Sequence, residues 1–260
     1  MKPAKVVERG KVRVKRSLTH ETQGVDVVNF PDFTPIVVLT KSSAYGAIGP
    51  YVLRDDKGRI LENVWQGSKV YEKVPQICDR NRHNGTLVWE HGEETHVEFD
   101  CDTKKFSVTK DYLAWRNKLM NWRVPVRYPV GYHHRHTCLF AMKEDDGGRI
   151  VPKTLGYVNS RKHIYVPIYD KAVRKAPLFH KLKERLNLGE NLMIIEVDGP
   201  HEESLDYYKK NYDVGDDFIV GSSIEASHRN LEIMINDTLH PYGHGYCLAA
   251  ALLDINVHSQ

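Results

Sequence analysis

The chain has 260 residues, of which 41% are hydrophobic and 27% are charged, and its formal net charge at pH 7 is +3. This length is sufficient for one large domain with a substantial buried core. No apolar run reaches the roughly 18 residues that a membrane span requires, and the first 20 residues lack the apolar segment of a secretory signal. We therefore expect an intracellular, cytoplasmic protein with no membrane partner.

The charge is distributed unevenly along the chain. Residues 1–20 carry seven Lys or Arg and one Glu, which leaves the remainder with a net charge of −3. This composition argues against a uniformly basic nucleic-acid-binding protein. We expect a basic N-terminal arm over residues 1–20, most simply a solvated terminus, which could also contact the phosphate backbone of a nucleic acid.

Short strand patterns dominate the first half of the chain. Residues 51–62 read as two extended pieces around a turn sequence, Asp-Asp-Lys-Gly, and the segment that follows, from Glu62 to Val74, predicts a helix of about three turns. The remaining patterns are strands at 35–40, 86–91, 96–100, 105–109 and 137–142 and a helix at 111–122.

The second half is more helical. Residues 168–191 have helical spacing interrupted at Pro177 and a stop signal at Gly189, and residues 192–200 predict a buried strand that ends in a tight turn. Further helices are expected at 201–212, at 227–237 and at 245–255. Because strands and helices are mixed without regular alternation, the sequence predicts an α+β fold.

One helical pattern has an unusual polar face. Glu62, Trp65, Gln66 and Lys69 stand at positions i, i+3, i+4 and i+7, which share one side of a helix. A solvated face with a hydrogen-bonded ladder is one interpretation. The other is the wall of a pocket, in which the indole stacks on a planar ring, the ammonium meets a phosphate and the carboxylate acts on a bond.

The same residues begin a resemblance to a known family. Pro50-Tyr51-Val52-Leu53 precedes Glu62-Asn63-Val64-Trp65-Gln66-Gly67-Ser68-Lys69, and KAVRKAPLFHKLKERLNLGENLMIIEVDG follows later as a helix and strand. Asn236-Asp237 then precedes Tyr242-Gly243-His244-Gly245 and Leu248. These motifs resemble, in order, those of the NADAR family, N-glycosidase-like proteins associated with NAD and ADP-ribose metabolism. Tyr242 stands where the family usually has Trp.

The resemblance implies a domain organisation. It suggests a single NADAR-like domain over residues 21–260 with a mainly helical core. Residues 76–160 have no counterpart in the family, so we expect an insertion at about 76–160 that adds β-strands to the core.

The resemblance also implies a reaction and a set of site residues. An N-glycosidase breaks the bond between a sugar and a base through an oxocarbenium-like transition state, which a carboxylate stabilises. We expect Glu62 in this role, Asp237 as a second carboxylate, and a substrate that is ADP-ribose-like, a ribosyl-base compound or a modified nucleic acid. No cofactor is expected. The residues expected to bind the substrate are Trp65, Gln66, Lys69, Asn236, Tyr242, Gly243, His244, Arg127 and Arg135.

Two other functions remain open. The same pocket could bind a nucleotide, ADP-ribose or a modified nucleic acid without turnover. Alternatively, histidines in two short segments could support a metal-dependent nucleic-acid-modifying enzyme, although prolines and glycines oppose the helices that would align them and no metal is expected. Those histidines are His133, His134, His136, His240 and His244.

Two further segments have more than one interpretation. Arg127 and Arg135 lie with three histidines in an irregular segment, which could be a binding surface or a solvated loop. Glu196 and Asp198 lie two apart, on one side of a predicted strand. They could form a paired-carboxylate site, but a strand end capped by its turn is the favoured interpretation.

Overall fold

The computed structural model describes residues 8–17, 29–39, 44–74, 76–82, 86–90, 97–103, 105–145 and 147–257. The chain divides into two compact units. Unit 1 comprises Met1–Gly49 and Tyr169–Gln260, and unit 2 comprises Pro50–Ile168. A single domain over residues 21–260 with an insertion at about 76–160 stays a prediction; unit 2 begins before that segment, at Pro50. Helices and β-sheets occur in both units, so the predicted α+β class is confirmed.

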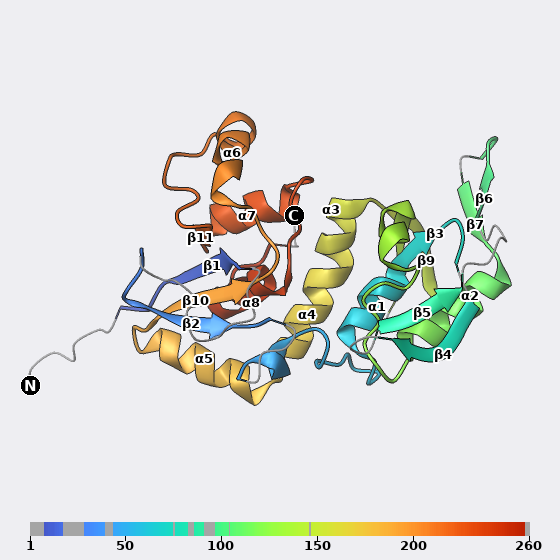
Figure 1. Cartoon of the computed structure of the whole chain (residues 1–260), viewed down its shortest axis with the longest axis horizontal. Coiled ribbons are helices and arrows are strands. Elements are labelled where there is room, and N and C mark those ends of the chain that lie inside the picture. The colour runs from blue at the N-terminus through green and yellow to red at the C-terminus, as the bar shows by residue number, and fades with distance from the viewer. Residues whose placement is uncertain are drawn as a thin grey trace, which may run out of the picture. The chain divides into compact units, whose positions relative to one another are not determined.

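A four-stranded sheet forms the centre of unit 1 (Figure 1). Its order is β11 (Ser223–Glu225), β1 (Val12–Arg16), β10 (Asn191–Glu196) and β2 (Phe33–Val37). β10 is parallel to both β1 and β2, and β11 is antiparallel to β1. The inner strand β10 is a largely apolar, buried run, as expected for a strand covered on two faces.

This sheet corrects part of the predicted basic arm. Residues 12–16 form an inner strand rather than a solvated terminus. Val12 and Val14 are buried, while Arg13 donates from Nε to Ser223 Oγ and stacks over the Phe30 ring. The alternation of valines with basic residues in VRVKR is the strand signal that the high charge of the segment conceals.

Two helices of unit 1 follow each other closely in the sequence and are separated by a short break before Pro177. α4 (Val166–Val173) contains the boundary between the units, and α5 (Pro177–Asn187) begins with proline in its first turn, where no backbone N–H is needed. The others are η1 (Gly46–Ile48), η4 (Glu202–Ser204), α6 (Leu205–Tyr212), α7 (His228–Asn236) and α8 (His244–Leu253). α8 is buried from His244 to Leu252 and packs against β1 and β10.

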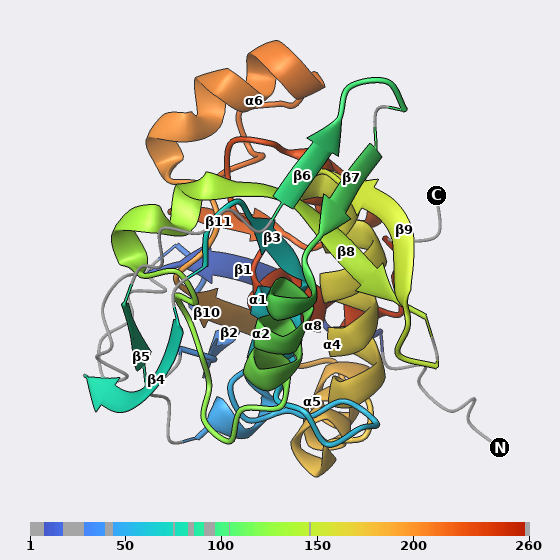
Figure 2. The ribbon, with the colours of Figure 1, turned by 90° about the vertical axis from the view of Figure 1, so that its right-hand side faces the viewer.

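Unit 2 combines short sheets with helices (Figure 2). One sheet has the order β3 (Lys69–Tyr71), β8 (Cys138–Glu144) and β9 (Ile150–Leu155). Two hairpins pair β4 (Gln76–Arg82) with β5 (Thr86–Glu90) and β6 (Val97–Asp100) with β7 (Lys105–Val108). The helices are α1 (Leu61–Ser68), α2 (Lys110–Met120), η2 (Tyr132–Thr137), α3 (Tyr157–Ser160) and η3 (Arg161–Tyr165).

The predicted helix that begins at Glu62 is shorter than expected. α1 ends at Ser68, and the chain continues as β3, in which Lys69 pairs with Ala141 of β8. Val70 and Tyr71 become fully buried in this pairing, which a further helical turn would prevent. Lys69 therefore follows the helix as its C-cap and does not occupy the i+7 position on its face.

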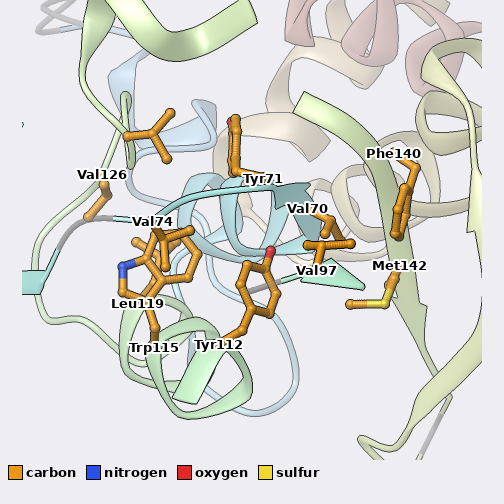
Figure 3. Packing of buried hydrophobic residues seen from close by; sticks show 11 residues of the cluster. Val70, Tyr71, Val74, Val97, Tyr112, Trp115, Leu119, Val126, Phe140 and Met142 are labelled. Atoms are coloured by element: carbon orange, nitrogen blue, oxygen red, sulfur yellow. The ribbon is translucent and has the colours of Figure 1, made fainter. Parts of the chain in front are cut away.

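The main core of unit 2 lies between α2, β3 and β8 (Figure 3). Tyr112, Trp115 and Leu119 of α2 pack with Val70 and with residues of the following strands. The remaining buried members of this cluster are Tyr71, Val74, Val97, Val126, Val130, Phe140 and Met142. Within the part of the chain that the structure describes, no helix is both long and apolar enough to cross a membrane.

Candidate functional site

Two side chains of α1 and the Lys69 side chain that follows it form a series of hydrogen bonds in unit 2. Glu62 Oε1 accepts a hydrogen bond of 2.8 Å from Gln66 Nε2, and Gln66 Oε1 accepts one of 3.0 Å from Lys69 Nζ. Because the amide donates at one end and accepts at the other, it connects a carboxylate to an ammonium group. Glu62 and Gln66 are only 6% and 8% exposed, so this series is not the solvated ladder of an ordinary surface helix.

An aromatic pair lies beside this series of hydrogen bonds. The Trp65 indole is 5.1 Å from the Tyr165 ring, centroid to centroid, and Lys69 Nζ is 4.9 Å from the Trp65 centroid. Tyr112 donates to the backbone oxygen of Lys69 and so fixes the start of β3. The arrangement provides a flat apolar surface, a cation and a carboxylate within one short segment.

The opposite side of α1 explains why the helix holds this position. Leu61 and Val64 are buried, and the Asn63 side chain, which is fully buried, makes three hydrogen bonds to the segment after α2. A glycine at position 67 allows the helix to approach Met120 of α2, because a Cβ there would collide with the Met120 side chain. α1 is therefore fixed on both faces.

Asp237, the second predicted carboxylate, lies in unit 1 at the C-cap of α7 and is fully buried. Its Oδ1 accepts hydrogen bonds from Tyr207 Oη (2.9 Å) and the Leu239 N–H (2.8 Å), and its Oδ2 accepts from Tyr208 Oη and His240 Nδ1. Burial alone would raise the pKa of Asp237, but these hydrogen bonds outweigh it and lower the pKa below its usual value. The carboxylate is thus ionised and held rigidly.

The other predicted residues of unit 1 surround the start of α8. Asn236 donates to the backbone oxygen of Glu232, and Tyr242 is buried with its ring 5.3 Å from that of Tyr246. His244 is the first residue of α8, and its Nε2 lies 2.7 Å from the backbone oxygen of Val38. A carbonyl only accepts, so Nε2 carries the proton and Nδ1 faces the opposite direction.

Nδ1 of His244 faces the carboxylate of Glu196, for which a structural role at a capped strand end is the favoured prediction. Glu196 is the last residue of β10 and fully buried, and its Oε2 lies 3.4 Å from this nitrogen. Gly243 lies against both Glu196 and Asp198, since a Cβ at that position would collide with carboxylate oxygens of each. The two acidic side chains therefore meet at the N-terminus of α8.

The environment of this acid pair favours protonation. Burial and then the neighbouring Asp198 raise the pKa of Glu196 well above its usual value, against the effect of the Gly245 and Tyr246 backbone N–H groups. Burial also lowers the pKa of His244. Both shifts favour the neutral forms, a protonated Glu196 beside an uncharged imidazole. The spacing of Glu196 and Asp198 was the sequence signal, but only the position of α8 reveals their shared surroundings.

Arg127 and Arg135 lie outside both groups, in the segment between α2 and β8. The Arg127 guanidinium is 5.2 Å from the Tyr128 ring centroid, and that of Arg135 is 3.8 Å from the Tyr132 centroid. His133, His134 and His136 are exposed. Among the residues that the structure describes, no three His, Cys, Asp or Glu side chains have an arrangement that could hold a metal ion.

The predicted site residues thus fall into separate groups. In unit 2 the structure brings together Glu62, Gln66, Lys69 and Trp65, and in unit 1 it gathers the segment from Asn236 to His244 near β10. The convergence of the two groups on one ligand stays a prediction. Comparisons of this chain with protein-family models, with curated proteins and with solved structures find no match.

Proposed function

We propose that this protein is an N-glycosidase that acts on an ADP-ribose-like, ribosyl-base or modified nucleic-acid substrate. Its α1 side chains bind the sugar whose N-glycosidic bond is broken. One observation carries the proposal. A carboxylate that is almost completely buried, Glu62, is connected through Gln66 to the Lys69 ammonium, beside the Trp65 indole. Burying a carboxylate costs free energy, so such a group in a polar, aromatic setting favours a functional role over a stabilising one.

The proposed chemistry uses each of these groups. As the bond between C1′ and the base nitrogen breaks, its electron pair leaves with the base and positive charge develops on the ribose. Glu62 stabilises this charge and orients the water that adds to C1′, and the proton released by the water goes to the base. Gln66 holds the carboxylate in orientation, Trp65 stacks on a planar ring, and Lys69 pairs with a phosphate.

The proposal assigns turnover to unit 2 and a different role to Asp237. Asp237 accepts hydrogen bonds from two tyrosines, a backbone N–H and His240. A carboxylate held by so many donors is suited to fixing the loop between α7 and α8. Asp237 is therefore proposed to position the loop that carries Tyr242, Gly243 and His244.

The test is release of base from candidate substrates by the purified full chain. ADP-ribose, NAD and a nucleoside panel are incubated with the protein, and the products are separated and identified by mass. Wild type is expected to release the base or the terminal group from at least one of these compounds. Glu62→Gln is expected to lower kcat by about 100-fold or more, because it removes an electrostatic catalyst. Retention of full activity by Glu62→Gln would overturn the assignment.

The matched control is Glu72→Gln, which makes the same chemical change at an exposed position of the same unit. It is expected to leave kcat and KM unchanged. Binding of ADP-ribose by wild type with no product after prolonged incubation would instead identify a binding module.

A further inference from the structure

A second feature of unit 2 is a long acid-free stretch. No Asp or Glu occurs between Asp111 and Glu144, whereas this stretch of 32 residues contains six Lys or Arg and three His. Arg116, which is buried, pairs with Glu144 at 2.9 Å. Because the stretch itself contains no acidic residue, it carries a local excess of positive charge that the overall net charge of +3 does not reveal.

The exposed part of this stretch alternates cations with aromatic rings. Lys118 lies over Trp122 at 5.6 Å, Arg127 over Tyr128 at 5.2 Å, and Arg135 over Tyr132 at 3.8 Å. Tyr128 and Tyr132 are edge to face at 5.1 Å, and Tyr132 is 52% exposed. We name the segment from Trp122 to His136 the basic-aromatic segment.

Buried side chains and hydrogen bonds fix the conformation of the basic-aromatic segment. Val126 and Val130 are fully buried in the core of unit 2, and exposed Arg123, Arg127 and Tyr132 are interspersed with them. Asn63 of α1 donates to the backbone oxygens of residues 122 and 124 and accepts from the Val126 N–H at 2.7 Å. The conformation is therefore fixed before any ligand binds, which reduces the entropy lost on binding.

We propose that the basic-aromatic segment binds single-stranded nucleic acid. A chain of phosphates matches its positive charge, and unpaired bases can stack on the exposed Tyr132 ring and on guanidinium planes. A duplex offers the charge but not the base faces, and an acidic peptide offers neither bases nor the regular spacing of phosphates. The inference stands on these contacts alone and does not require that unit 2 catalyses a reaction.

The test measures binding of a fluorescein-labelled 20-nucleotide oligo(dT) and of an oligo(U) of the same length by anisotropy at several salt concentrations. Wild type is expected to bind at least one of the two with an affinity that falls as salt rises. Arg127→Ala with Arg135→Ala should reduce the slope of log K against log salt by about 1.4, since each phosphate contact on a single strand contributes about 0.7. Tyr132→Ala should weaken binding about tenfold at unchanged slope, as loss of a stacking platform does.

The matched control is Arg149→Ala, which removes an 87% exposed arginine of the same unit outside the acid-free stretch. It is expected to bind as wild type does. Absence of binding to both oligonucleotides, or affinities of the Arg127/Arg135 and Tyr132 variants equal to wild type, would overturn the proposal. Equal or tighter binding of a duplex or of poly-glutamate would also overturn it, because neither presents unpaired bases.

Discussion

Two buried glutamates have opposite environments. Glu62 accepts a hydrogen bond from the Gln66 amide, which in turn accepts one from the Lys69 ammonium group. Glu196 instead lies beside the Asp198 carboxylate and the His244 imidazole. An ionised carboxylate suits the first position and a protonated one the second. At the scale of single residues, this contrast explains why we assign catalysis to Glu62.

The Glu196 environment predicts a pH dependence of stability. A carboxyl whose folded pKa is raised stabilises the protein fully below its unfolded value of about 4.5, and that contribution is lost as pH rises toward the folded pKa. Glu196→Gln removes this loss. The free energy of unfolding of the variant should therefore gain on wild type above pH 4.5, by at most about 1.4 kcal/mol per pH unit.

Urea unfolding of both proteins between pH 4 and pH 8 measures this difference. Asp198→Asn is the companion variant, because it removes the neighbouring charge and should reduce the slope in the same direction. Parallel stability curves for wild type and Glu196→Gln would show that folding does not raise the pKa of Glu196.

At the scale of elements, Asn63 connects α1 to the basic-aromatic segment. Its side chain satisfies two backbone oxygens and the buried Val126 N–H. Asn63→Ala leaves these groups without their partner, so we expect a loss of about 2–3 kcal/mol in the free energy of unfolding and weaker oligonucleotide binding. Asn117→Ala, at an exposed position of α2, is the control for chemical denaturation. A loss below about 0.5 kcal/mol for Asn63→Ala would contradict the role of this side chain.

A buried ionic cluster joins three elements of unit 2. Glu144 of β8 lies 2.9 Å from both Arg59, in the turn before α1, and Arg116 of α2. Glu144→Gln leaves the Arg116 guanidinium without its anion and leaves Arg59 with Asp55 alone, so a loss of about 3 kcal/mol is expected. Arg149→Ala disrupts an exposed pair and should cost less than about 1 kcal/mol. Similar midpoints for the two variants in urea unfolding would disprove this difference.

The helices and strands predicted from sequence agree with the structure where a local pattern of residues determines the element. The strands at 86–91, 96–100 and 105–109 and the helix at 111–122 match β5, β6, β7 and α2 to within two residues. The break at Pro177 separates α4 from α5 as expected. The end of α1 could not be predicted locally, because pairing with β8, about 70 residues later, turns Lys69 into a strand residue.

The same limit applies to the candidate site. The order Glu62, Trp65, Gln66 along one helical face was sufficient to predict their proximity. The approach of α8 to the end of β10, which brings His244 to Glu196, depends on tertiary packing that no short motif contains. The function of Asn63 was also hidden, since its partners lie about 60 residues away in the chain.

At the scale of the whole molecule, the sheet of unit 1 connects distant parts of the chain. β1 pairs along its length with β10, so Val12 lies opposite Leu192, and unit 2 occurs between β2 and β10 in the sequence. Such pairings carry a large entropic cost of loop closure, which the buried apolar strands must offset.

This topology predicts that the N-terminal segment is structural. Deletion of residues 1–17 removes β1, which separates β11 from the sheet and leaves β10 paired on one side only, and should prevent unit 1 from folding. Deletion of residues 1–7 leaves β1 intact and should preserve the near-ultraviolet circular dichroism spectrum. A native spectrum and cooperative unfolding after deletion of residues 1–17 would mean that β1 contributes little.

The central claim is that the α1 side chains bind the sugar of an N-glycosyl substrate. The most direct measurement is a crystal structure of the Glu62→Gln variant with ADP-ribose bound. We expect ribose C1′ within about 3.5 Å of the residue 62 side chain, the separation of a reactive complex, with Lys69 on a phosphate oxygen. ADP-ribose bound away from α1, in a crystal with this face accessible, would contradict the claim.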